Sequence, residues 1–283
     1  MPVAVVKTLD YLGNRPRLIV AGKYLPDDNI AFVDRKNSCL LMTNTDKETF
    51  EELDLVKLLP DNYRNLKGNE VIKPSDVNKG FEDDQLLITF TGKDFSFAVA
   101  CKLEKKNESF VLIPVFPPVK ISNRTRSVIA IDSDHVCATT EYYVIIKRKD
   151  DDTDTDVKSH PRVKRDRGGL LIADGQRRFY YGDGDCFVGC HWDGTQITEE
   201  FRVSDRRMKF PRGSAIASSG RILVCCDSSH TIYSISCDGK DFKVVHFDGE
   251  KWFGDIDFNS SGKQFFTSFW HDNKWPVLFK YEA

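Results

Sequence analysis

The internal repetition of the chain constrains its fold more than any other feature. Four stretches each begin with a short apolar run, turn at a polar or glycine site and continue through two more strand-like runs; they start at Ser127, Gly169, Gly213 and Gly254. The starts are spaced by about 40 to 45 residues, which is the period of a four-stranded propeller blade. The repetition predicts an all-β fold, a β-propeller of about six four-stranded antiparallel blades.

The predicted blades cover residues 1–283 as a single domain. The N-terminal half is less regular, with strand runs and longer insertions in residues 17–55 and 70–115, and residues 45–59 have some helical character. We place the blades at residues 16–59, 69–117, 118–163, 164–205, 206–249 and 250–283. The last blade is one strand short, and residues 2–9 can supply the missing strand, which would close the ring and remove its open sheet edges.

The composition is that of a globular chain with a large core and a well-hydrated surface. Of its 283 residues, 40% are hydrophobic and 30% are charged, with a formal net charge of −2. The chain has no apolar run long enough to span a membrane, and its first residues lack the pattern of a secretory signal. Its eight cysteines lie mostly in strand-like runs and form no disulfide framework. We therefore expect a cytoplasmic protein with reduced cysteines and no membrane partner.

No motif in the sequence indicates catalysis or a bound cofactor. The six histidines fall at different points of their repeats, so they do not predict a metal site on the axis. Cys186 and Cys190 would be about 13 Å apart on a strand, too far to share a zinc ion. Serine near histidine, as in Ser229-His230, lies in a turn, and no nucleophile elbow or phosphate loop is present. We expect no enzyme activity, no metal, no cofactor and no small-molecule substrate.

One segment carries a family resemblance. Residues 210–242 run through a proline and glycine, a first strand, the turn Ser218-Ser219-Gly220, an apolar strand that ends at Asp227, a turn with His230, a third strand and Asp238-Gly239-Lys240. This order resembles an NHL repeat, although Thr231 stands where the family commonly has arginine. The resemblance implies a six-bladed propeller similar to the C-terminal domain of tripartite-motif proteins, which binds single-stranded RNA or protein. No RING or B-box spacing is present, so ubiquitin ligase activity is not expected in this chain.

Basic residues are concentrated in the loops that a propeller places on one face. Loops from the fourth strand of a blade to the first strand of the next share a face with the turns between second and third strands, and here these loops carry an excess of lysine and arginine with some aromatic residues. The predicted RNA- or partner-binding residues are Arg35, Lys36, Tyr63, Arg64, Lys67, Lys120, Arg124, Arg126, Lys164, Arg165, Arg167, Arg206, Arg207, Lys209, Phe210, Arg212 and Trp252.

The basic face suggests a binding platform with one of two ligands. Cations beside aromatic rings are the combination that single-stranded nucleic acid uses, with phosphates on the cations and bases stacked on the rings. We therefore expect recognition of single-stranded RNA. The alternative is a protein–protein interaction domain in which the same arginines bind an acidic segment of a partner, as in substrate or adaptor recognition by a ubiquitin ligase.

Overall fold

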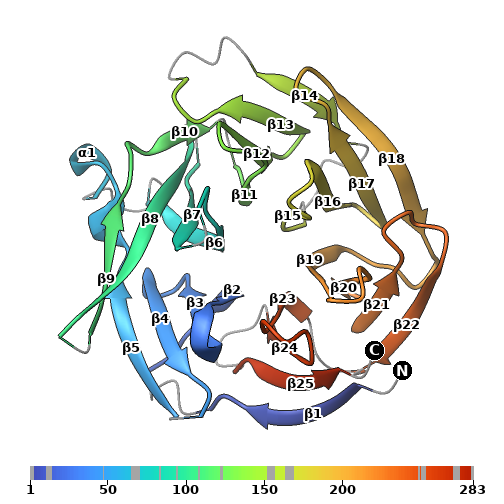
Figure 1. Ribbon diagram of the computed structural model, residues 1–283, viewed down its shortest axis with the longest axis horizontal. Helices are drawn as coiled ribbons and strands as arrows, with labels where there is room; N and C mark the ends of the chain where they lie inside the picture. The colour runs from blue at the N-terminus through green and yellow to red at the C-terminus, as the bar shows by residue number, and fades with distance from the viewer. Residues whose placement is uncertain are drawn as a thin grey trace.

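Six antiparallel sheets stand around a central axis and form a closed six-bladed β-propeller (Figure 1). The computed structural model describes residues 3–10, 15–46, 48–64, 71–82, 84–93, 95–107, 109–121, 124–151, 157–162, 169–247, 249, 253–269 and 275–281. Within these residues, no helix is long and apolar enough to cross a membrane.

The first three blades run in chain order from the inner to the outer strand. Blade 1 contains β2 (Ile19–Tyr24), β3 (Asn29–Asp34), β4 (Cys39–Asn44) and β5 (Thr49–Asp54). Blade 2 contains β6 (Lys73–Lys79), β7 (Gln85–Thr91), β8 (Ser96–Lys106), β9 (Ser109–Pro114) and β10 (Val119–Ile121). Blade 3 contains β11 (Ser127–Ala130), β12 (His135–Thr139), β13 (Tyr143–Arg148) and β14 (Lys158–Pro161).

The other three blades repeat this plan and return to the start of the chain. Blade 4 contains β15 (Ile172–Ala173), β16 (Arg178–Asp183), β17 (Cys186–Trp192) and β18 (Ile197–Ser204). Blade 5 contains β19 (Pro211–Ile216), β20 (Ile222–Cys226), β21 (Thr231–Ile235) and β22 (Phe242–Phe247). Blade 6 contains β23 (Phe253–Phe258), β24 (Gln264–Phe269), β25 (Val277–Tyr281) and, from the N-terminus, β1 (Val3–Thr8).

The N-terminal strand closes the ring, as predicted. β1 is the outer strand of blade 6 and pairs antiparallel with β25, from Val3 opposite Tyr281 to Thr8 opposite Val277. The two ends of the chain consequently lie close together in Figure 1. Leu9, which follows β1, is fully buried in the cluster between blades 6 and 1.

The core is divided among the blade interfaces. Apolar side chains of the described residues form six clusters, one between each pair of neighbouring blades. The strands β20 and β24, whose side chains are apolar on both faces, contribute to the clusters on both sides of their blades. The blades approach so closely that a Cβ on Gly182 would collide with the carbonyl oxygen of Pro211 in the next blade.

Blade 2 departs from the regular plan and changes one predicted boundary. Its long strand β8 pairs through its first part with β10 and through its last part with β9, so that the β8–β9 hairpin extends toward blade 1. Residues 119–121 therefore belong to blade 2, whereas the sequence-based boundary assigned them to blade 3. Residues 45–59, with their helical character, contain the edge strand β5 and the short 3-10 helix η2 (Val56–Leu58), because pairing with β4 fixes this segment as a strand.

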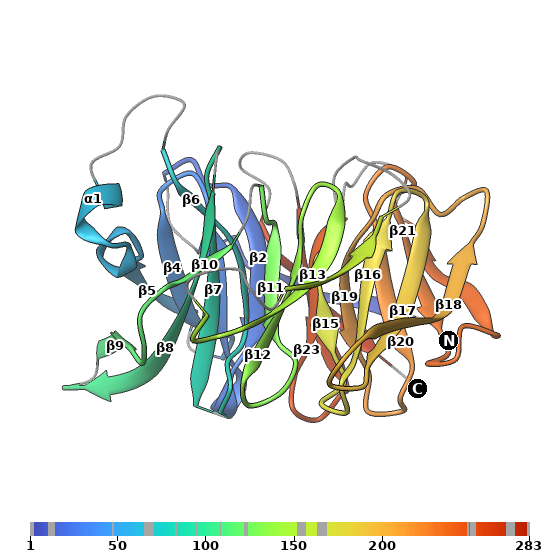
Figure 2. The same ribbon diagram turned by 90° about the horizontal axis from the view of Figure 1, so that it is seen from above.

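The loops between blades define what we call the connecting face. It carries the links from each outer strand to the next inner strand and the turns between second and third strands. The short helix α1 (Asp61–Arg64), which precedes β6, marks this side at the upper rim in Figure 2. A second 3-10 turn, η1 (Pro26–Asp28), joins β2 to β3 on the opposite side of blade 1.

Candidate functional site

Four arginines of the connecting face line one pocket on the central axis. Its cavity volume is about 210 Å³, and it is lined by Arg35, Ser75, Thr91, Arg124, Arg126, Leu170 and Arg212. These residues come from inner strands, entry loops and turns of five blades. The pocket therefore lies where these blades meet around the central axis. No acidic residue is among its described lining residues. We refer to this cavity as the arginine pocket.

Arg35 has the environment expected of an anion-binding group. It follows β3 in the turn of blade 1, and its Nη1 donates a hydrogen bond to the carbonyl oxygen of Pro74 at 3.2 Å. No carboxylate among the described residues pairs with its guanidinium. Burial lowers the pKa of Arg35, because the charged form loses hydration that nothing acidic replaces. An anion entering the pocket would restore that lost stabilisation.

Hydroxyl groups fix the wall of the arginine pocket. The Thr91 hydroxyl donates to Ser75 Oγ at 2.8 Å, and the Ser75 hydroxyl donates to the carbonyl oxygen of Arg126 at 3.0 Å. These bonds join blade 2 to the loop that enters blade 3. They hold the backbone that carries Arg124 and Arg126 in place around the axis.

Some basic residues of the connecting face are structural. Three arginines each pair with an aspartate at the end of a second strand: Arg17 with Asp34, Arg162 with Asp183 and Arg212 with Asp227. Arg17 and Arg212 lie at the start of the same blade as their aspartate, whereas Arg162 follows β14 of blade 3 and reaches Asp183 in blade 4. All six side chains are buried. Arg212 was predicted as a binding residue, and its ion pair shows that part of its charge is already offset inside the fold.

Other predicted cations pair with carboxylates at the surface or cap a helix. The pairs are Arg207 with Asp205 at 3.2 Å, Lys209 with Asp185 at 2.9 Å and Arg124 with Glu141 at 3.3 Å. Arg64 donates to the carbonyl oxygens of Leu59 and Lys57 and so fixes the turn around α1. Arg206, in contrast, is exposed and has no partner among the described residues.

The two predicted aromatic residues that the structure describes are partly packed into the fold. The Tyr63 ring lies 4.9 Å from each of the Phe95 and Phe97 rings, measured between centroids. Lys120 lies in β10 and places its Nζ over the Phe95 ring at 5.4 Å. Phe210 is half-buried in a left-handed backbone conformation with φ of 53°.

The remaining predicted residues complete this comparison. Lys36 is exposed in the same turn as Arg35, and its backbone N–H donates to Asp34. Lys67, Lys164, Arg165, Arg167 and Trp252 lie outside the described residues. The structure thus brings Arg35, Arg124, Arg126 and Arg212 together. Sequence reasoning missed Ser75, Thr91 and Leu170. Ser75 lies within β6, Thr91 ends β7 and Leu170 precedes β15, and their place along the predicted strands was the only signal.

A buried acidic network lies next to the arginine pocket along the inner strands. Asp76 follows Ser75 in β6, and its carboxylate accepts hydrogen bonds from the Ser127 hydroxyl, the Asn78 amide and the Val77 N–H. Burial raises the pKa of Asp76 to about 7 despite these bonds. Burial, with the nearby Asp76 carboxyl, also raises the pKa of Asp255 well above its ordinary value. Both groups favour the protonated form, because two negative charges close together in a buried region are costly.

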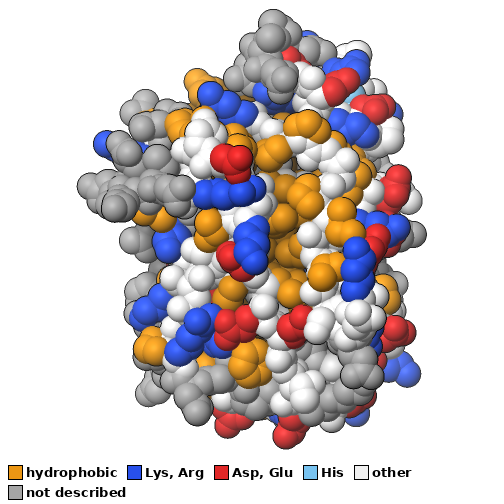
Figure 3. Space-filling model, turned by 90° about the vertical axis from the view of Figure 1, so that its left-hand side faces the viewer, with side chains coloured by type: hydrophobic (Ala, Val, Ile, Leu, Met, Phe, Trp, Pro, Cys, Tyr) orange, Lys and Arg blue, Asp and Glu red, His pale blue; other side chains and the backbone are white. Residues whose placement is uncertain are grey.

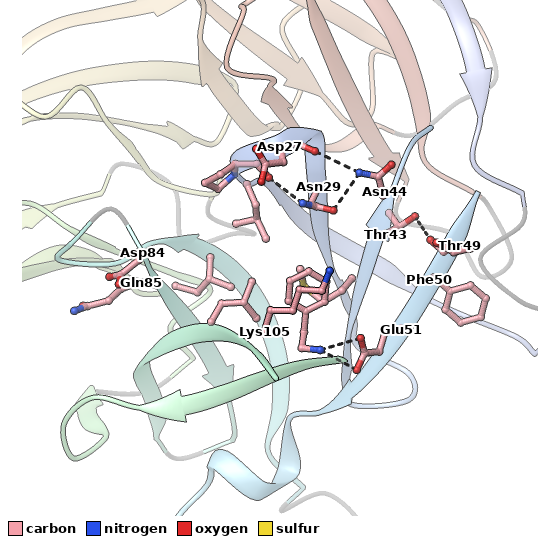
Figure 4. Close-up of a pocket in the computed structure, with 16 residues that line it drawn as sticks. Asp27, Asn29, Thr43, Asn44, Thr49, Phe50, Glu51, Asp84, Gln85 and Lys105 are labelled. Atoms are coloured by element: carbon pink, nitrogen blue, oxygen red, sulfur yellow. Dashed lines mark hydrogen bonds between the residues drawn. The ribbon is translucent and has the colours of Figure 1, made fainter. Parts of the chain in front are cut away.

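A larger pocket opens on the side of the ring between blades 1 and 2. Its cavity volume is about 590 Å³. Side chains of both blades form an apolar floor, which is visible as hydrophobic surface near the centre of Figure 3; the floor consists of Leu25, Met42, Phe50, Leu86, Leu103 and Phe110. Polar residues surround it, including Asp27, Asn44, Glu51, Asp84 and Lys105 (Figure 4). We refer to this cavity as the lateral pocket.

The β8–β9 hairpin builds one wall of the lateral pocket. The backbone N–H of Phe110 in β9 donates to both carboxylate oxygens of Glu51 in β5, at 3.2 and 3.0 Å (Figure 4). β5 and β9 do not pair as strands, since the blade 1 sheet ends at β5. The two blades are therefore tied together by side-chain contacts while a hollow remains between them. The sequence showed only an insertion here, without any sign of a cavity.

Comparisons with known proteins define the architecture. No protein-family model matches the sequence, and no curated protein matches it. Among solved structures, the chain is similar to the β-propeller domain of Cps50 (Swd1) from Myceliophteria thermophila, with a TM-score of 0.62 and 10% identity over 99% of this chain and 100% of that chain. It is also similar to streptogramin B lyase, with a TM-score of 0.58 and 8% identity over 96% of this chain and 85% of that chain. At such identities the likeness shows the β-propeller fold alone, and the six blades are given by the six sheets of the described residues.

The part of the chain that the structure describes contains no group of three or more histidine, cysteine, aspartate or glutamate side chains arranged to hold a metal ion. The arginine pocket and the lateral pocket differ in chemistry. The arginine pocket is small and cationic, whereas the lateral pocket is larger, with an apolar floor and a rim that carries both acidic residues and Lys105.

Proposed function

We propose that this propeller is a non-enzymatic binding platform that captures single-stranded RNA on its connecting face, with a backbone phosphate held in the arginine pocket. The observation that supports this proposal most directly is the convergence of four guanidinium groups on one cavity without an acidic lining residue. Arginine binds phosphate oxygens through paired hydrogen bonds, and each such contact is charge-assisted.

The position of the pocket suits a strand that crosses the face. Arg35 and Arg124 come from blades 1 and 3, and Arg206 stands exposed in the loop between blades 4 and 5. A phosphate at the axis and others on the surrounding loops would place successive bases above neighbouring blades. Sequence preference would then arise from contacts to base edges, as phosphate contacts carry none. The NHL-like order of residues 210–242 agrees with this proposal.

An acidic segment of a protein partner is the second candidate ligand. The observation in its favour is that cations of this face already bind carboxylates of the chain itself, as Lys209 does with Asp185 at 2.9 Å. A partner's aspartate, glutamate or phosphorylated side chain offers the same oxygens. In that case the propeller would recognise a substrate or an adaptor, in keeping with a ubiquitin ligase assembly.

Fluorescence polarisation with labelled oligouridine and oligoadenine of about ten nucleotides tests the proposal. The variant Arg35→Gln/Arg124→Gln removes two pocket cations and should lower the slope of log affinity against log salt by about 0.7 for each phosphate that is no longer bound. Its matched control is Arg148→Gln/Lys149→Gln. β13 begins at the connecting face with Tyr143, so these two cations at its other end lie away from that face. The control should bind RNA like the natural sequence.

Two results would count against RNA. One is a well-folded protein that binds neither oligonucleotide at low salt and copurifies without RNase-sensitive nucleic acid. The other is equal weakening by the pocket variant and its control, which would indicate unspecific attraction. If a labelled polyglutamate peptide binds instead and only the pocket variant fails to bind it, the acidic-partner alternative replaces RNA.

A further inference from the structure

The lateral pocket has the size and floor of a site for a large apolar group. Its volume of about 590 Å³ falls within the range of about 300 to 1,000 Å³ that is typical of ligand cavities. Met42 and Leu86 at its base are almost fully buried, while Leu103 and Phe110 are half-buried at its sides. An inserted aromatic or aliphatic side chain would cover apolar surface that water now touches.

The charged residues around the pocket favour an occupant with a positive charge. Three of its lining residues are acidic, Asp27, Glu51 and Asp84, and one of the described lining residues is a cation, Lys105. Asp84 already pairs with Lys102 at 2.8 Å, and Glu51 accepts the Phe110 N–H, so the charge available at the rim is mainly that of Asp27. Asp27 is exposed in the turn η1, and its carboxylate has no partner among the described residues. Lys105 is exposed and extends across the hollow between the blades (Figure 4). The rim thus already accommodates an ammonium group and favours a cationic neighbour.

The strand beside the pocket favours an extended peptide as the occupant. β5 is the edge of the blade 1 sheet, and edge strands present unpaired backbone groups to an added extended segment. Polar side chains along β5 are exposed or half-buried, so a peptide can approach this edge without displacing the core. A peptide lying along β5 would direct alternate side chains into the pocket.

We infer that the lateral pocket is a docking site for an extended segment of a protein partner that carries one large apolar side chain close to a lysine or arginine. The apolar side chain enters the floor between blades 1 and 2. The basic side chain lies at the rim beside Asp27 and displaces the flexible Lys105 toward solvent. This site shares no lining residue with the arginine pocket, so it can be tested independently of RNA binding.

The experiment starts from the full chain immobilised as a target for random twelve-residue peptides displayed on phage. The enriched peptide is synthesised with a fluorescent label and its affinity is measured by polarisation. Replacing its apolar anchor by alanine should weaken binding about tenfold or more. Replacing its basic residue by glutamate should also weaken binding, because the acidic rim then repels it.

Two pairs of matched variants locate the peptide on the protein. Asp27→Asn removes a rim charge and should weaken binding about threefold, whereas Lys105→Gln removes the rim cation and should strengthen it about threefold. Asp28→Asn and Lys106→Gln are the controls, since both residues are exposed neighbours outside the pocket lining. Asp27 and Asp28 share a left-handed conformation, with φ of 58° and 53°, which asparagine tolerates.

The inference is overturned if selection enriches no motif or enriches acidic peptides. Equal effects of the pocket variants and their controls would overturn it as well. So would the absence of peptide binding in Arg35→Gln/Arg124→Gln, which would place the peptide on the connecting face. Normal RNA binding by Asp27→Asn and Lys105→Gln would show that the two surfaces work separately.

Discussion

Replacing Asp76 by asparagine should flatten the dependence of stability on pH. Asp76 is buried beside the axis, and burial raises its pKa to about 7 from an ordinary value of 3.8. Its carboxylate accepts hydrogen bonds from Ser127, Asn78 and Val77. These bonds stabilise the charged form and by themselves would lower the pKa. The pKa is raised because the cost of desolvating the charged carboxylate is larger than the stabilisation that the bonds provide.

The sign and size of the effect follow from this pKa. In the unfolded chain the carboxyl loses its proton near pH 4, whereas in the fold it keeps the proton until about pH 7. The stability contributed by protonated Asp76 is complete below pH 4 and is lost as the pH rises toward 7. The slope within that window is about 1.4 kcal/mol per pH unit, and the total is at most about 4 kcal/mol. Asparagine has no proton to lose.

Urea unfolding at a series of pH values between about 4 and 8 measures the effect. Asp76→Asn also changes hydrogen bonds, and this shifts the unfolding free energy of the variant by a similar amount at each pH. The natural sequence and the variant are therefore compared by the slope of unfolding free energy against pH. Asp241→Asn removes an exposed carboxyl and serves as the control. If Asp76→Asn and the natural sequence have parallel curves across this window, the reasoning about the buried carboxyl is refuted.

Three further changes test the ring and its faces. Leu9→Ala removes a fully buried side chain behind the closing strand and should cost about 2 to 5 kcal/mol in one cooperative transition; separate transitions in calorimetry would contradict closure by β1. Arg162→Ala removes the buried donor to the Thr140 and Gly182 carbonyl oxygens while Asp183 keeps Arg202, so it should cost about 1 to 3 kcal/mol by urea unfolding; an unchanged unfolding free energy would contradict this. Arg206→Gln should lower the salt slope for RNA by about 0.7, while Arg207→Gln, already paired with Asp205, should lower it less in the same titration; the reverse order would contradict the assignment.

The fold was predictable where the sequence repeats a local pattern. The turn at Ser218-Ser219-Gly220 contains a glycine at φ of 77°, a conformation that glycine adopts without strain. The strand that follows, β20, is apolar on both faces because it is buried between two neighbouring blades. Closure by β1 was predictable for a similar reason, since an unpaired strand and an incomplete blade stood at opposite ends of the chain.

The lateral pocket was not predictable, because it depends on contacts between two irregular blades. Phe110 and Glu51 are far apart in sequence, and their hydrogen bonds arise only when the β8–β9 hairpin leans against blade 1. The alternation within each strand identifies which side chains are apolar. It gives no information about the angle between the hairpin and its neighbour, and this angle sets the volume of the hollow.

Counting charges over the loops overstates the binding capacity of the connecting face, because some of the counted cations are ion-paired inside the fold. Arg212 is one of the basic residues counted there, yet it is buried with Asp227, fifteen positions further along the chain and in the same blade. A guanidinium held this way fixes a loop and has less charge to offer a ligand. Arg35 differs, because its burial is not matched by a carboxylate among the described residues. Ligand affinity should therefore depend on the few cations whose desolvation an incoming anion would relieve, more than on the total charge of the face.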